Sequence, residues 1–133
     1  MRSKIAAGFG ALSMAVGMVV ALPALPVAAA APGYHLKWGQ TWSKGTVTFN
    51  NRSVAVVGQQ KSVSKNDCRR TYASAHAANG KELGYAITPW VCGTTAKYTL
   101  NVPANVRGGA AYVKVHFQDH AANTVAGATV RKP

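Results

Sequence analysis

The chain has 133 residues, a length that allows one ordinary domain and little more. It carries 15 Lys and Arg against only 3 Asp and Glu, which gives a net charge of +12. Glycoside hydrolysis needs a pair of carboxylates, and hard-cation binding needs several. Their scarcity argues against chemistry of that kind. The positive charge leaves nucleic acid, an anionic membrane, a cell-wall polymer or an acidic protein as candidate partners.

The N-terminal segment has the three-part pattern of a secretory signal peptide. Arg2 and Lys4 precede a long uncharged and mostly apolar stretch, which is followed by two prolines and a run of alanines. The alternative is a membrane anchor, but three glycines dilute the apolar stretch and no positive cluster follows it. The pattern predicts a cleaved signal peptide at residues 1–31 and a secreted single domain at residues 32–133. Loss of the two basic residues lowers the net charge to +10.

The two cysteines of the chain both lie in the predicted mature domain. An even cysteine count in an exported protein indicates a disulfide, here Cys68–Cys92. Closing a loop of about 25 residues is worth about 3.5 kcal/mol in the chain-entropy model. The alternative is a metal site. His76 lies between the cysteines, but no Cys-x-x-Cys pair or His-x-x-x-His helix accompanies it. We therefore expect a disulfide, with no metal and no cofactor.

Apolar and polar residues alternate with period two along the mature chain, which is typical of half-buried strands. The predicted strands, in chain order, span residues 34–42, 46–49, 52–57, 68–78, 98–102, 111–117 and 124–130. Asn50-Asn51 predicts a tight hairpin. Residues 81–87 are expected to form one helical turn or a loop. The pattern predicts an all-β fold: a small antiparallel sandwich or barrel of six or seven strands, immunoglobulin-like or a related Greek key.

Candidate catalytic groups are few. The chain has no Gly-x-Ser-x-Gly motif, and neither cysteine is expected to be a free thiol. Asp119 and His120 lie near His116, but without a nucleophile or oxyanion donors this grouping indicates a solvated strand end. Asp67 and Glu82 lie in turn-like segments. We therefore expect a protein that is not an enzyme.

The basic residues are spread along the chain, and only two adjacent pairs occur among the mature residues. Nucleic-acid readers cluster lysine and arginine and interleave aromatic residues. The spread therefore indicates a solvated surface, with no nucleic-acid partner and no stable membrane insertion. A weak attraction to anionic cell-envelope polymers is expected from the charge alone.

Four aromatic residues are the candidate partner-binding residues. Tyr34, Trp38 and Trp42 share one face of the first predicted strand, and Trp90 lies near Cys92. They can form the core, as large aromatic residues do in small domains, or they can bind a sugar or a partner protein. A third interpretation is that the first strand pairs with the edge of another protein's sheet.

The Ala-rich signal, the short strands and the single cysteine pair resemble the small exported β-sandwich proteins of actinobacteria. That class includes inhibitors of α-amylases and proteases and adaptor subunits of secreted toxin particles. The resemblance implies a secreted binding module that contacts another extracellular protein, with an adaptor subunit of a secreted toxin-type assembly as one form of this role. A first alternative is an inhibitor of an extracellular hydrolase, with residues 81–90 as its loop, and a second is a cationic antimicrobial or wall-binding protein. The chain has no Trp-Arg-Tyr triplet of the amylase inhibitors, so no functional residue is carried over.

Overall fold

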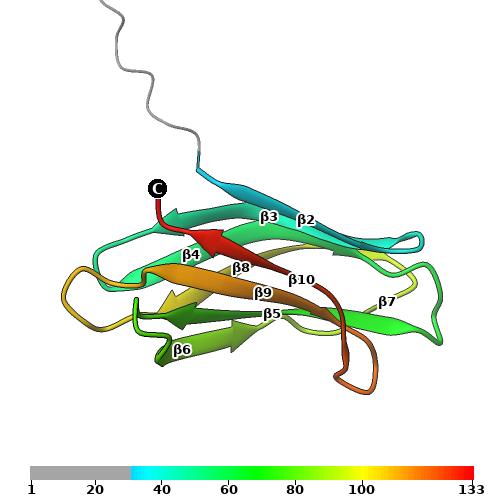
Figure 1. Cartoon of the computed structure of the whole chain (residues 1–133). Coiled ribbons are helices and arrows are strands. Elements are labelled where there is room, and N and C mark those ends of the chain that lie inside the picture. The colour runs from blue at the N-terminus through cyan, green and yellow to red at the C-terminus, as the bar shows by residue number, and fades with distance from the viewer. Residues whose placement is uncertain (1–30) are drawn as a thin grey trace, which may run out of the picture. The chain divides into compact units, whose positions relative to one another are not determined.

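Alternating side chains fold the chain into two antiparallel sheets that face each other (Figure 1). The computed structural model describes residues 31–133, so the predicted signal peptide, apart from Ala31, lies outside the described residues. The four-stranded sheet has the order β2 (Gly33–Trp38), β3 (Thr41–Phe49), β4 (Ser53–Lys61), β8 (Thr95–Pro103). The other sheet has the order β10 (Thr124–Arg131), β9 (Tyr112–Gln118), β5 (Cys68–His76), β6 (Glu82–Ile87), and the short β7 (Val91–Cys92) also pairs with β5.

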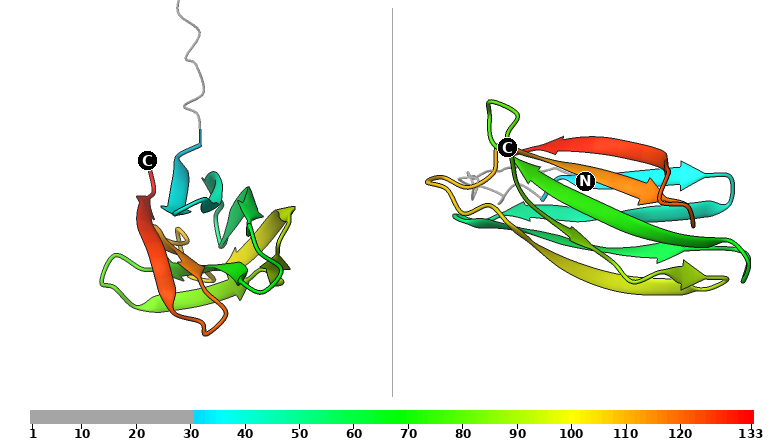
Figure 2. Two further views of the ribbon diagram at one scale, coloured as in Figure 1. Left: turned by 90° about the vertical axis from the view of Figure 1, so that its right-hand side faces the viewer. Right: turned by 90° about the horizontal axis from the view of Figure 1, so that it is seen from below.

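The order of the strands is that of a Greek-key sandwich. β8 lies beside β4 and β9 lies beside β5, so the β7–β8 and β8–β9 connections each cross between the sheets. β10 approaches β2, and β6 approaches β8, at the two sides of the sandwich (Figure 2). At the second side a Cβ on Gly84 would stand 2.5 Å from the carbonyl oxygen of Pro103, so this approach requires glycine. The predicted antiparallel sandwich is confirmed.

The β3–β4 hairpin forms as the sequence predicts. Val47 pairs with Val56 and Phe49 with Val54, and the amide of Asn50 donates to the carbonyl of Ser53 at 2.9 Å. The inward side chains of both sheets form one core, in which β5 contributes small residues and β9 the large ring of Phe117. The core includes Leu36, Val47, Val54, Val56, Ala73, Ala75, Leu100, Val102, Val113, Val115, Phe117 and Val130.

Two predicted segments are wrong, and the strand count is nine instead of the expected six or seven because β6 and the short β7 were not predicted. The segment 34–42 is not one strand, because the chain reverses after Trp38 through Gly39, whose φ of 62° suits a hairpin turn. Residues 82–87 form strand β6 instead of a helical turn or loop. Gly80, with a φ of 92°, allows the preceding turn, and β6 then pairs along β5. No helix of residues 31–133 is long and apolar enough to cross a membrane.

A chain of buried hydroxyl groups joins the two sheets. Ser43 Oγ lies 2.7 Å from both the Tyr98 hydroxyl and Thr71 Oγ1, and Thr71 Oγ1 donates to Gln60 Oε1 at 2.8 Å. The hydroxyls of Tyr34 and Tyr98 also hydrogen-bond to each other. Because an amide oxygen can only accept, the chain runs in one direction, with Tyr34 donating to Tyr98, Tyr98 to Ser43 and Ser43 to Thr71. Burial and the neighbouring Tyr98 raise the pKa of Tyr34 far above its ordinary value.

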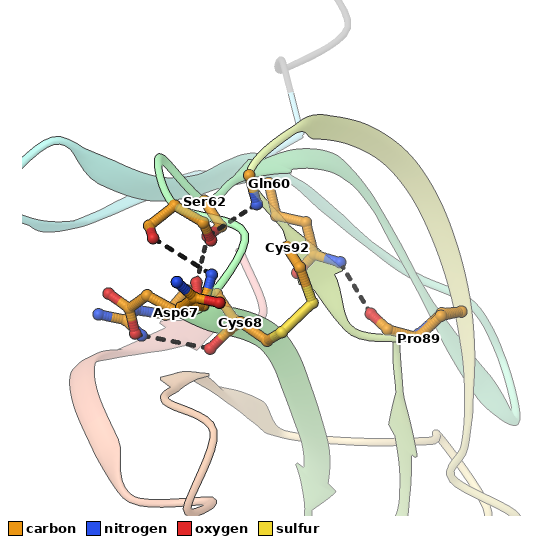
Figure 3. Close-up of a disulfide and its surroundings, with 10 residues drawn as sticks. Gln60, Ser62, Asp67, Cys68, Pro89 and Cys92 are labelled. Atoms are coloured by element: carbon orange, nitrogen blue, oxygen red, sulfur yellow. Dashed lines mark hydrogen bonds and ion pairs between the residues drawn. A yellow bond between two sulfur atoms is a disulfide. The ribbon is translucent and has the colours of Figure 1, made fainter.

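The disulfide closes one end of the sandwich (Figure 3). Cys68 and Cys92 are direct cross-strand partners of β5 and β7, with Cα atoms 4.2 Å apart, so the predicted disulfide is confirmed. Beside it the buried Ser62 Oγ accepts from the amide of Gly93 at 3.2 Å and donates to the carbonyl of Asp67. Arg69 is buried here and pairs with the carboxylate of Asp67. These contacts hold the loop after β4 against β7.

Candidate functional site

The structure separates the four aromatic residues that the sequence singles out. Tyr34 is only 7% exposed and belongs to the core. Trp38 is 56% exposed at the β2–β3 turn, where the strand extends beyond the core. The turn makes even positions of β2 and odd positions of β3 face inward, so Trp42 lies on the outer face. The prediction that Tyr34, Trp38 and Trp42 share one face is therefore wrong, because Trp42 faces the other way.

The fourth residue, Trp90, belongs to a larger aromatic surface. This surface, called the aromatic face below, covers the outer side of the β10-β9-β5-β6 sheet and is defined by Arg70, Tyr72, Tyr85, Ile87, Trp90, Tyr112 and His116. The strand register brings them together: Tyr72 of β5 lies between Ile87 of β6 and His116 of β9. Tyr85 is 55% and Trp90 42% exposed, and Ile87 is also exposed. Single exposed apolar residues are ordinary, but a group of neighbouring ones on one face is typical of an interaction site.

The rings of the aromatic face pack against one another. Tyr72 and Tyr85 stack with centroids 5.5 Å apart, and His116 meets Tyr72 edge-on at 5.8 Å. Such pairs contribute about 0.5–1.5 kcal/mol each beyond the area they bury. Burial, together with the charge of Glu82, raises the pKa of Tyr72, so its phenol stays neutral well above neutral pH. The face is therefore ordered before any partner binds.

Two arginines lie over rings at opposite ends of this face. The guanidinium carbon of Arg70 lies 4.4 Å from the centroid of Trp90, and that of Arg131 lies 5.2 Å from Tyr112. Arg70 Nε also donates to Gln118 Oε1 at 2.8 Å. Stacking on Trp90 and the hydrogen bond to Gln118 hold the guanidinium of Arg70 in place, and its terminal nitrogens make no hydrogen bond to other residues of 31–133. The arrangement presents fixed donors to a carboxylate.

A serine and a histidine beneath the face have the geometry of a catalytic pair. Ser74 Oγ lies 2.9 Å from His76 Nε2, and His76 Nδ1 lies 3.3 Å from the carbonyl of Gly80. The carbonyl accepts only, so Nδ1 carries the proton and Nε2 accepts from the serine. Ser74 is only 2% exposed, and the His76 ring is stacked 5.0 Å from Tyr112. In this position the pair supports the Tyr112 ring, which packs against His76.

A shallow hollow of about 370 Å³ adjoins the aromatic face. It lies where Gly127 has no side chain, and it is lined by Lys114, His116, Thr124, Gly127, Ala128 and Thr129. His116 Nδ1 lies 3.2 Å from Thr124 Oγ1. Desolvation, and then the charges of Lys114 and His76, lower the pKa of His116, so its ring is neutral at pH 7. The hollow can accept a side chain of a partner beside the rings.

Of the groups considered for catalysis, Asp119 and His120 occupy the β9–β10 turn, whereas His116 lies in β9 and Glu82 in β6. The carboxylate of Asp119 accepts hydrogen bonds from the amides of Ala121 and Asn123, each at 3.0 Å. The Asn123 bond is the largest cause that lowers the pKa of Asp119. His120 is exposed, and no hydrogen bond among residues 31–133 joins Asp119 to a histidine. Among residues 31–133 there is no group of three or more His, Cys, Asp or Glu side chains that could hold a metal ion.

Sequence reasoning missed most of the aromatic face. Each contributing strand shows the pattern: Tyr72 alternates with buried Ala73, and His116 alternates with buried Val115 and Phe117. The sequence does not say that β5 and β9 are neighbours, since 35 or more residues separate the paired positions. Only that pairing turns scattered aromatic residues into one surface.

Comparison with known proteins finds no relative for this chain: no protein-family model, no curated protein sequence and no solved structure matches it.

Proposed function

We propose that this chain is a non-catalytic binding module that contacts another extracellular protein through the aromatic face. The observation that supports this most strongly is the pairing of rings on the outer face with arginines that lie over them, Trp90 with Arg70 and Tyr112 with Arg131. Tryptophan, tyrosine and arginine are the residues that dominate binding energy at protein interfaces. An adaptor between secreted proteins would use this surface for one of its two partners.

The geometry of the rings favours a protein over a sugar. Sugar binding by stacking needs a ring that turns its flat side to the solvent. Tyr72 and Tyr85 instead turn their flat sides toward each other, with only 18° between their planes. Arg70 and Arg131 cover sides of Trp90 and Tyr112. Each of these contacts covers one flat side of a ring and places another ring or a guanidinium group beside it, an arrangement that suits the side chains of a partner protein.

The charge of the face favours an acidic partner. Arg70, Lys114 and Arg131 lie on the outer side of this sheet, and Glu82 at the start of β6 is the one carboxylate in its strands. A partner with carboxylates opposite the arginines would associate faster at low salt and would form charge-assisted hydrogen bonds.

The hydrolase-inhibitor alternative requires an exposed loop at residues 81–90, and most of this segment is not a loop. Residues 82–87 of the predicted 81–90 loop are strand β6, paired with β5 along its length. The remaining exposed piece around Pro89 and Trp90 is short and is fixed by Gln60 Nε2, which donates to the Pro89 carbonyl at 3.2 Å. We therefore place the contact on the sheet face.

The test is affinity capture from culture supernatant with matched variants. W90A/Y85A removes the two most exposed rings of the aromatic face, and W38A removes an equally exposed ring elsewhere. We expect the wild type and W38A to recover the same protein and W90A/Y85A to bind it at least about 30-fold more weakly, the equivalent of about 2 kcal/mol. Recovery of only the free monomer at low salt, or equal recovery by all three, would contradict the proposal.

A further inference from the structure

The outer side of the other sheet carries a band of lysines. Each of the four strands contributes one: Lys37 from β2, Lys44 from β3, Lys61 from β4 and Lys97 from β8. Lys37, Lys44 and Lys97 are exposed, and Lys61 is half-buried. This surface, with Trp42 and His35, is called the lysine face below. Spread along the sequence, these residues suggested no cluster; the strand register assembles them.

The register arranges the lysines as a zigzag. Lys37, Trp42 and Lys61 lie side by side in one row, and His35, Lys44, Gln59 and Lys97 lie side by side in the next. Diagonal neighbours on a sheet are about 7–8 Å apart, so the four lysine positions form a zigzag line across the strands. Lys44 Nζ also lies 4.8 Å from the centre of the Trp42 ring, which places that indole inside the line.

Nothing on this sheet balances the charge. The three carboxylates of the chain are Asp67, Glu82 and Asp119, and none lies in β2, β3, β4 or β8. Like charges at neighbouring positions of a sheet repel one another. An anionic ligand would remove this repulsion, so the charge of the face complements a polyanion.

The presence of lysines, and not arginines, on this face reduces the range of candidate anionic ligands. The basic side chains of this face, apart from His35, are lysines, whereas the arginines among residues 31–133 lie in loops and on the other sheet. Arginine binds planar carboxylates and phosphates in a two-pronged manner, whereas lysine binds phosphate as a point charge without that fixed geometry. A flat band with one ammonium group per strand fits an extended chain lying across the strands.

We infer that the lysine face is a second binding surface and that it takes a linear poly(polyol phosphate), a polymer whose phosphodiester groups meet the four lysines in turn. The inference is independent of the proposed function, because it concerns the opposite sheet and uses none of the residues of the aromatic face.

The test measures binding of a synthetic poly(glycerol phosphate) chain. Variant K37Q/K44Q/K61Q/K97Q removes the band, and K65Q/K81Q/R107Q/K132Q removes four exposed charges elsewhere, so the net charge is the same. By analogy with single-stranded nucleic acid, four phosphate contacts give a log–log salt slope near −3, roughly 50-fold weaker binding at 200 mM than at 50 mM salt. We expect the band variant to lose most of this slope and the control variant to keep the wild-type affinity within a few-fold.

Each other outcome overturns the inference. Equal losses in both variants would show that net charge alone drives binding. If the wild type did not bind the polymer at 50 mM salt, the lysine face would not be a binding surface for it. Stronger binding to anionic phosphatidylglycerol vesicles or to polygalacturonate than to poly(glycerol phosphate), if the band variant loses it, would assign the face to a membrane or to a carboxylate polymer.

A local readout guards against an indirect effect of the substitutions. In a W38F/W90F background Trp42 is the only tryptophan left in the chain, and both replaced residues are exposed. We expect the polymer to protect Trp42 from acrylamide quenching. Unchanged quenching with the polymer bound would contradict a site on this face.

Discussion

The two outer faces of the sandwich follow the same alternating pattern but carry different chemistry. On the aromatic face contacts within the fold hold the polar side chains in place: Arg70 lies against Trp90, and Ser74 bonds to His76. On the lysine face the four ammonium groups have no carboxylate on their sheet. The first face is preorganised for a specific protein surface, whereas the charge of the second complements a linear polymer of phosphate groups. The net charge of the molecule therefore describes neither face.

The largest expected effect comes from the disulfide, which lies beside the aromatic face. C68A/C92A should lower the free energy of unfolding by about 3.5 kcal/mol, because the unfolded chain loses a loop constraint. Urea denaturation measures this. In the fraction that stays folded, partner affinity should fall because Trp90 is two residues from Cys92, and polymer binding by the lysine face should persist. A loss below about 1 kcal/mol would contradict this account.

Next in size is the buried hydroxyl chain, which supports both faces equally. S43A removes the acceptor of the Tyr98 hydroxyl and the donor to Thr71. We expect a loss of about 1–3 kcal/mol in thermal or urea unfolding, the cost of leaving buried polar groups unpaired. T46A, at an exposed position of the same strand, is the control and should stay within about 0.5 kcal/mol of the wild type. Equal effects of the two substitutions would argue against the chain.

A small increase in stability is expected from a substitution in the β9–β10 turn, at the edge of the aromatic face. Ala122, in the β9–β10 turn, has a φ of 63°, a conformation that a Cβ disfavours. A122G should raise the free energy of unfolding by up to about 1 kcal/mol without changing either binding activity. The neighbouring A121G, which only adds freedom to the unfolded chain, is the control and should not stabilise.

The smallest expected effect is a pH dependence confined to the aromatic face. The lowered pKa of His116 means that the unfolded chain binds its proton more readily than the folded chain does. Stability from this group is therefore present above the ordinary imidazole pKa of about 6.5 and is lost as the pH falls through the lowered folded-state value. H116Q should flatten the slope of unfolding free energy between pH 7 and pH 5. H35Q, on the lysine face, is the matched control, and equal flattening by both would contradict the assignment.

Local patterns predicted the sandwich, the disulfide and the Asn50-Asn51 hairpin because each depends on residues close in sequence or on a single cysteine pair. The turn at Gly39 could not be separated from a continuous strand, since alternation continues across it to Trp42. β6 was missed because its pairing with β5 stabilises residues that read as a loop on their own. Both faces depend on which strands are neighbours, and that information is not local. The residues of each face can be identified from the sequence, but their assembly into one surface cannot be predicted from it.

The most direct test of the central claim compares cross-linking from the two faces. A photo-reactive phenylalanine analogue replaces Tyr85 on the aromatic face in one variant and Thr99, exposed on the opposite sheet, in another. With a captured partner protein, we predict a cross-linked product from position 85 and none from position 99, whether or not poly(glycerol phosphate) is present. A product from position 99 of equal yield, or from that position alone, would contradict the assignment of the protein partner to the aromatic face.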